Sequence, residues 1–156
     1  MFRSKGKHTS IDEILGHRSL LEYTDGSFQE RTDLPIRILN PGKGISQDAW
    51  ALLDTGADTC VIPRNISDAV GHDFDGHGVK SEITSGVSGE TSTYKHTFIL
   101  QLYDDSCEDI VWSSGEMLVD CVGTDGLPPL IGVRNFLKDF KVTIDYPKKT
   151  ITLSWN

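Results

Sequence analysis

Residues 51–63 read Ala51-Leu52-Leu53-Asp54-Thr55-Gly56-Ala57-Asp58-Thr59-Cys60-Val61-Ile62-Pro63, and this run is the strongest indication of the fold of the chain. It places the carboxylate of Asp54 between two apolar runs, where a charge is disfavoured unless hydrogen bonds hold it. The tight turn that follows needs a glycine, Gly56, because a side chain at this position would collide with neighbouring atoms. The pattern predicts a strand that ends at Asp54, a tight loop and a second strand that returns to the core. A surface turn capped by Asp54 is the alternative, but it does not explain apolar runs on both sides.

This run resembles the active-site loop of the retropepsins, the retroviral-type aspartic proteases. The resemblance implies that Asp54 is the catalytic residue and that Thr55 and Gly56 hold it with hydrogen bonds. It also implies that Ala57 and Asp58 bind the main chain of a peptide substrate.

A second motif lies about thirty residues further along the chain. In the stretch 82–94, which continues into 96–102, two β-prone segments lie on either side of a tip built from Ser, Gly, Val, Ser and Gly at 85–89, which predicts a hairpin. Its position resembles that of the retropepsin flap, a hairpin that closes over bound peptide. The resemblance implies substrate-binding roles for Gly86, Val87, Ser88 and Gly89, whereas an ordinary surface hairpin is the alternative interpretation.

A third motif, Leu130-Ile131-Gly132-Val133-Arg134-Asn135, is similar to the other hallmark of the family, a strand that packs under the active-site loop and leads into a short helix. The chain departs from the usual pattern because Val133 is inserted before Arg134. In retroviral enzymes such an arginine pairs with the Asp that follows Asp-Thr-Gly-Ala. The sequence leaves open whether Arg134 reaches Asp58.

Together the motifs predict an all-β fold, namely a retropepsin-like acid-protease closed β-barrel with a flap hairpin and a short C-terminal helix, one lobe per chain, over residues 34–156. Further strands are expected at 34–39, 47–54, 110–112 and 116–122, with a last hairpin at 141–153. Pro63 to Val70 is expected to form a short helical turn. Residues 1–33 are expected to form a leader, partly helical or disordered, and the capping-box spacing of Ser10-Ile11-Asp12-Glu13 predicts its short helix.

A single Asp-Thr-Gly in 156 residues predicts a homodimer. Aspartic proteolysis needs two carboxylates about 3 Å apart that share one proton. Since one chain supplies one such group, two copies must bring their Asp54 side chains together on a two-fold axis. The expected reaction is endopeptidase cleavage of peptides or proteins by activated water, without a metal or other cofactor, and with an acidic to neutral optimum.

Two other functions fit the same fold. One is a retropepsin-like module that dimerises or binds peptides without cleaving them, since fold does not determine function. The other is an unrelated, non-enzymatic small barrel, which would be a monomer. If the protein is a protease, apolar residues such as Ile62, Val87 and Ile131 indicate hydrophobic side chains in its substrate.

The composition argues against some classes of binding partner and predicts where in the cell the protein is found. A net charge of −8 argues against nucleic acid and against an anionic membrane surface as partners. No signal peptide or membrane-length apolar run is recognisable, which predicts a cytoplasmic protein. The odd cysteine count, made up of Cys60, Cys107 and Cys121, predicts thiols rather than disulfides. The loop around His72 and His77 could hold a metal only weakly, and a surface loop explains its composition equally well.

Overall fold

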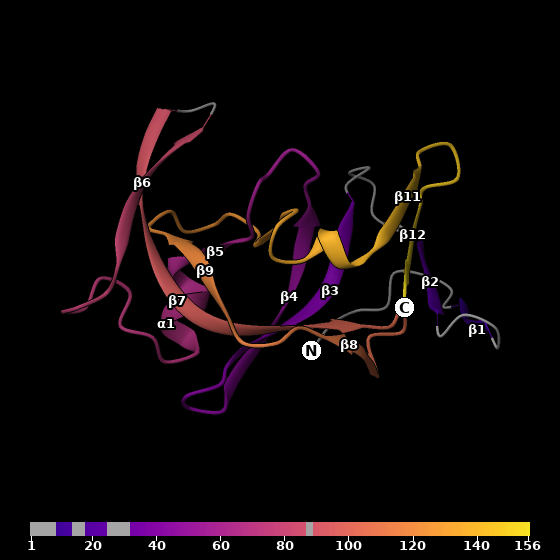
Figure 1. Ribbon diagram of the computed structural model, residues 1–156, viewed down its shortest axis with the longest axis horizontal. Coiled ribbons are helices and arrows are strands. Elements are labelled where there is room, and N and C mark those ends of the chain that lie inside the picture. The colour runs from indigo at the N-terminus through magenta and orange to yellow at the C-terminus, as the bar shows by residue number, and fades with distance from the viewer. Residues whose placement is uncertain (1–8, 14–17, 25–31, 87–88) are drawn as a thin grey trace.

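The computed structural model of the chain describes residues 9–13, 18–24, 32–86 and 89–156 (Figure 1). Its strands are β1 (Thr9–Glu13), β2 (Arg18–Thr24), β3 (Asp33–Asn40), β4 (Ile45–Leu53), β5 (Val61–Pro63), β6 (Ser81–Gly86), β7 (Gly89–Tyr103), β8 (Ile110–Ser113), β9 (Met117–Val122), β10 (Leu130–Ile131), β11 (Lys141–Asp145) and β12 (Thr150–Trp155). The helical elements in this part of the chain are α1 (Arg64–Ala69) and the 3-10 turn η1 (Leu137–Asp139). None of the helices described is long and apolar enough to cross a membrane.

Six of the described strands close into a barrel. Their order is β3-β4-β10-β5-β9-β7, and β7 pairs back with β3. Closure leaves these strands without free edges. Outside the ring, β6 and β8 each pair with β7, so that β6 and the start of β7 stand out from the barrel as a hairpin (Figure 1). The predicted all-β closed barrel and its hairpin are therefore confirmed.

Alternation of side chains along the strands builds the core. In an extended strand, successive side chains point to opposite faces, so residues two apart share one face. Ile36 and Ile38, two residues apart in β3, share the inner face, and both are fully buried. The fully buried apolar residues of the barrel strands are Leu34, Ile36, Ile38, Ala51, Ile62, Phe98, Leu100, Leu102, Cys121 and Ile131.

The short strand β10 positions the candidate site. It runs parallel to β4, with Leu130 opposite Leu52, and antiparallel to β5, with Leu130 opposite Val61. Since β4 and β5 flank residues 54–60, β10 joins the two strands from which this loop emerges. The predicted helical turn after Pro63 is confirmed as α1.

A second, four-stranded sheet has the order β1-β2-β12-β11 and lies at the opposite end of the molecule from β6 (Figure 1). The short helix predicted from Ser10 is wrong, because Thr9–Glu13 forms β1 and pairs with β2. A capping-box spacing is only a local signal, whereas β1 gains backbone hydrogen bonds by pairing with β2 from Thr9–Glu22 to Glu13–Arg18, and β2 in turn pairs with β12. The division of the chain at residue 33 stays a prediction.

Aromatic side chains pack between the barrel and η1, β11 and β12. The ring of Phe136 lies 4.9 Å from that of Trp112 and 5.0 Å from that of Phe140, and Phe140 lies 5.5 Å from Trp155. Phe136 is fully buried. The short helix predicted after Gly132 takes the form of η1, whose first residue, Leu137, is also buried.

Replacing Phe136 by Ala is therefore expected to lower the free energy of unfolding by about 3–5 kcal/mol, because a large buried ring is lost and the space cannot fully close. Urea unfolding followed by tryptophan fluorescence would measure the change. Tyr146→Ala is the control, since that ring is 68% exposed. A loss below about 1 kcal/mol in Phe136→Ala would contradict the packing described.

Candidate active site

Asp54 stands at the point where β4 ends and the 54–60 loop begins. Its backbone N–H donates to the Ile131 carbonyl at 3.0 Å, and its own carbonyl accepts from the N–H of Ala57 at 3.2 Å. The Asp54 carboxylate accepts a hydrogen bond from the N–H of Gly56 at 2.9 Å. Asp54 is half-buried, whereas Thr55 and Gly56 are exposed. The backbone therefore fixes a carboxylate at the surface end of a barrel strand.

The turn after β10 supports the loop through the backbone. The N–H of Val133 donates to the Ala57 carbonyl at 3.0 Å, and the N–H of Arg134 donates to the Asp58 carbonyl at 2.8 Å. The Arg134 guanidinium also reaches the Asp58 carboxylate of its own chain, with Nη2 and Oδ2 3.8 Å apart. Both side chains are largely exposed, so this ion pair is weak and the two backbone bonds fix the geometry.

Asn135 makes two contacts that the sequence did not predict. Its Oδ1 accepts a hydrogen bond from the N–H of Cys60 at 3.0 Å, and its Nδ2 donates to the Leu118 carbonyl at 3.3 Å. One amide thus ties the end of the loop to β9. Its place directly after Arg134 was the available signal, but the partners depend on how distant strands align.

Gly132 allows β10 to lie directly against the loop. A Cβ atom at this position would lie 2.3 Å from the Thr59 carbonyl oxygen and 2.9 Å from that of Ala57. Contacts this short with backbone atoms cannot be relieved by rotating a side chain. Gly132 also donates its N–H to the Cys60 Sγ at 3.3 Å. No larger residue fits here without moving the loop that carries Asp54.

The two predicted groups of site residues lie in different places. Asp54, Thr55, Gly56, Ala57 and Asp58 share the loop between β4 and β5. The described end of the hairpin is the pair Gly86 and Gly89, and it stands apart from that loop (Figure 1). Gly89 has φ +110°, which favours glycine. Val87 and Ser88 lie outside the described residues.

An apolar pocket of about 250 Å³ adjoins the strands that carry the loop. It is lined by Leu52, Val61, Pro63, Val122, Leu127, Pro128 and Leu130. Leu52 precedes Asp54 by two residues, so alternation places both on the same face. The expectation that Ile62 and Ile131 shape such a pocket is wrong, because both are fully buried in the core. Their neighbours Val61 and Leu130 face the pocket instead.

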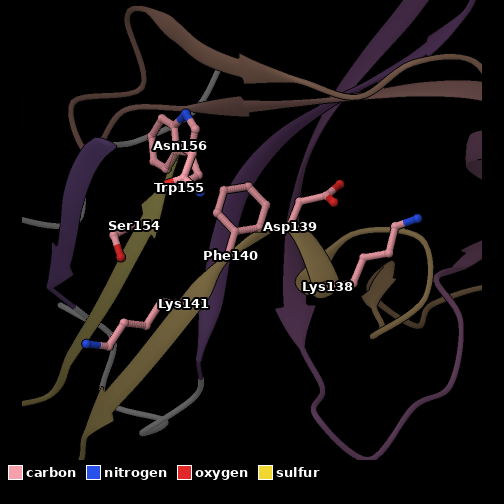
Figure 2. Close-up of a pocket in the computed structure, with 7 residues that line it drawn as sticks. All are labelled: Lys138, Asp139, Phe140, Lys141, Ser154, Trp155 and Asn156. Carbon is pink, nitrogen blue, oxygen red and sulfur yellow. The ribbon is translucent and has the colours of Figure 1, made fainter. Parts of the chain in front are cut away.

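A second hollow, of about 220 Å³, lies where η1 and β11 meet the end of β12. Figure 2 shows the ring of Phe140 at its centre, with the ammonium groups of Lys138 and Lys141 directed to opposite sides. The charged ends do not converge on a shared point, and we assign no ligand to this hollow.

One histidine of the 71–78 loop, His72, has protein partners. His72 Nε2 lies 3.0 Å from the Thr97 carbonyl oxygen, and its ring lies 4.6 Å from that of His96. Burial and the neighbouring His96 lower the pKa of His72, so the ring is neutral near pH 7. In the described parts of the chain, no three His, Cys, Asp or Glu side chains gather as a metal site would require.

Comparisons with known proteins agree with the architecture. No family model and no curated protein matches the chain. Among solved structures, a retropepsin-like aspartic protease from Rickettsia conorii is similar with a TM-score of 0.60 over 96% of both chains, at 15% sequence identity. The chain has a retropepsin-like fold. At this level of identity, the likeness shows the fold alone.

Gly132→Ala is expected to destabilise the protein by about 3 kcal/mol and to disturb the 54–60 loop, because the added methyl group would overlap the Thr59 carbonyl. Thermal unfolding and amide exchange at residues 56–60 would measure the two effects. Gly115→Ala is the matched control, since nothing lies within 4 Å of a Cβ atom there. Equal stability of the two variants would contradict the close contact.

The cysteines are expected to differ in reactivity. Burial raises the pKa of Cys60 to about 11 and that of Cys121 to about 12, so at pH 8 only about one in a thousand Cys60 thiols is ionised. Cys107 is only half-buried. A thiol reagent at pH 8, followed by peptide mass mapping, should label Cys107 first in the folded protein and all three cysteines in urea. Equally fast labelling of Cys60 would show that the loop opens.

Proposed function

We propose that this protein is an aspartic endopeptidase, which hydrolyses peptides or proteins with the Asp54 carboxylates of two identical chains. The observation that carries the proposal is the carboxylate at the end of β4, half-buried and held by the N–H of Gly56. The retropepsin-like fold around this loop supports it.

The chemistry needs two carboxylates in different protonation states. About 3 Å apart, both cannot be charged, so the pair holds one proton. The charged carboxylate takes a proton from water, whose oxygen forms a bond to the peptide carbonyl carbon, while the protonated one donates to the carbonyl oxygen. Collapse of this tetrahedral adduct breaks the C–N bond, and the amine leaves with a proton. The steps need no covalent enzyme intermediate.

A homodimer is required because each chain has a single Asp-Thr-Gly. The exposure of Thr55 and Gly56 leaves the turn of the loop accessible to a second copy. An isologous contact would place the two loops on the same axis, with each chain contributing the same residues. In that arrangement Thr55 from each chain stiffens the pair by hydrogen bonds across the axis.

Substrate binding is assigned to the loop, the hairpin and the apolar pocket. The carbonyls of Ala57 and Asp58 already accept hydrogen bonds from Val133 and Arg134. The Asp58 carboxylate, 82% exposed, is therefore the group we assign to the peptide main chain. Residues 86–89 would cover the bound peptide. The pocket that includes Leu52 and Leu130 favours an apolar substrate side chain beside the scissile bond.

Asp54→Asn is expected to reduce cleavage of a peptide library by at least about 10²–10⁴-fold, because the amide can neither accept a proton from water nor share one with its partner. Mass spectrometry of the digest would measure the rates and show whether cuts fall beside apolar residues. The fold of the variant and the mass of its dimer in solution should stay unchanged.

Asp139→Asn is the control, since it removes an exposed carboxylate on η1. Full cleavage by Asp54→Asn would contradict the assignment. A wild-type dimer that binds peptides and cuts none would instead favour the non-cleaving module, and a wild-type monomer without activity would favour the non-enzymatic barrel.

A further inference from the structure

A series of polar contacts runs from the candidate active-site loop to the base of the β6–β7 hairpin. Thr59 Oγ1 donates to Asp120 Oδ2 at 3.1 Å. Lys95 Nζ donates to Asp120 Oδ1 at 2.6 Å and lies 3.4 Å from Glu82 Oε2. The contributing segments are the 54–60 loop, β9, β7 and β6. We call Thr59, Asp120, Lys95 and Glu82 the polar chain.

Strand register places the polar chain on the outer face of the barrel. Lys95 lies opposite Asp120, and Asp120 lies opposite Val61. Val122, two residues after Asp120, lines the apolar pocket together with Val61. Cys121, between them, points to the core and is fully buried. The polar chain therefore borders the pocket on the same face as the loop.

Burial makes the central ion pair strong. The Asp120 side chain is 11% exposed and that of Lys95 is 20% exposed, whereas Glu82 is 48% exposed. Each Asp120 oxygen has a hydrogen-bond donor, as a buried carboxylate requires. The hydrogen bond to Asp120 raises the pKa of Lys95, so the ammonium group stays charged. Water and salt screen this contact less than an ion pair at the surface.

The two ends of the polar chain differ in how closely the surrounding structure packs against them. At one end, Thr59 belongs to a loop packed against Gly132. At the other end, Glu82 lies on β6, which among the described strands pairs with β7 alone. All residues of β6 are exposed. The ion pair from Glu82 to Lys95 therefore joins an edge strand to a buried carboxylate that also holds the loop.

We propose that Lys95 and Asp120 are positioning residues, which couple the base of the β6–β7 hairpin to the loop that carries Asp54. When the hairpin moves, Glu82 shifts the ammonium group of Lys95, Asp120 follows, and the Thr59 hydroxyl transmits the change to the loop. The catalytic use of this coupling rests on the proposed function. The coupling itself is a property of the folded chain that is measurable without cleavage.

Glu82→Gln is the first test, because Glu82 is half exposed and the variant keeps its shape. Hydrogen exchange is expected to become about 3- to 10-fold faster at the amides of residues 56–60, including that of Cys60, although Glu82 contacts none of them. The melting temperature should change little. Glu90→Gln is the matched control, since Glu90 is exposed on the same hairpin and lies outside the polar chain. Equal loop exchange in the two variants would overturn the proposal.

A double-mutant cycle separates coupling from ordinary stabilisation of the sheet. Thr59→Val removes the hydroxyl that contacts Asp120 and keeps the shape of the side chain. In that background Glu82→Gln should no longer change exchange at the loop. Additive effects of the two substitutions would contradict transmission through the polar chain.

Kinetics distinguish failure of this proposal from failure of the proposed function. If the wild type cleaves peptides, Glu82→Gln should lower kcat/KM about 3- to 10-fold, with no further loss when it is added to Thr59→Val. Cleavage without the exchange effects would overturn the coupling and leave the protease assignment intact. The exchange effects without cleavage would support the coupling and contradict the protease assignment.

Discussion

The close approach of Gly132 to the carbonyls of Thr59 and Ala57 is the constraint on which the rest of the site depends. Because no side chain separates them, β10 fits between β4 and β5, the strands on either side of the 54–60 loop. The backbone of the following turn then meets that of the loop, and Val133 and Arg134 donate to it. The position of Asp54 follows from main-chain contacts, which ordinary side-chain motion does not disturb.

The same strands have one face in the core and another that lines the apolar pocket. Ile62 and Ile131 point inward and pack the barrel, while Val61 and Leu130, one residue earlier in each strand, line the apolar pocket. Leu52 lines that pocket two residues before Asp54. The loop thus rests on β10, an apolar pocket adjoins it, and β6, an edge strand, makes an ion pair through Glu82 to Lys95 of β7.

Much of the fold was predictable because its signals are local. Alternation in β3 and β7, the turn at 40–44 and the Asp-Thr-Gly loop each depend on a few neighbouring residues. The helix predicted from Ser10 was wrong, since pairing of β1 with β2, which itself joins the sheet of the distant β12, outweighs a capping signal. Which of Val61 and Ile62 faces inward was not predicted correctly either, because a short apolar run without polar alternation does not define a face.

The contacts around the site that the sequence did not predict depend on long-range alignment of strands. The bonds of Asn135 to Cys60 and Leu118 depend on how segments far apart in the chain align. Contacts of Asp120 with Thr59 and Lys95 depend on the register of β9 against both neighbours. No local pattern contains that information. The link between Arg134 and Asp58, which the sequence left open, is made within one chain, and its exposure makes it weaker than the backbone bonds beside it.

If Asp54 acts only together with its copy in a second chain, activity depends on how often two intact chains meet, which mixing experiments measure. Wild-type protein and Asp54→Asn would be combined at constant total concentration, allowed to exchange subunits, and assayed for peptide cleavage. If both carboxylates are needed, an equal mixture retains about one quarter of the wild-type activity, because only wild-type pairs work. Retention of about one half would mean that each chain acts alone, and would contradict the account.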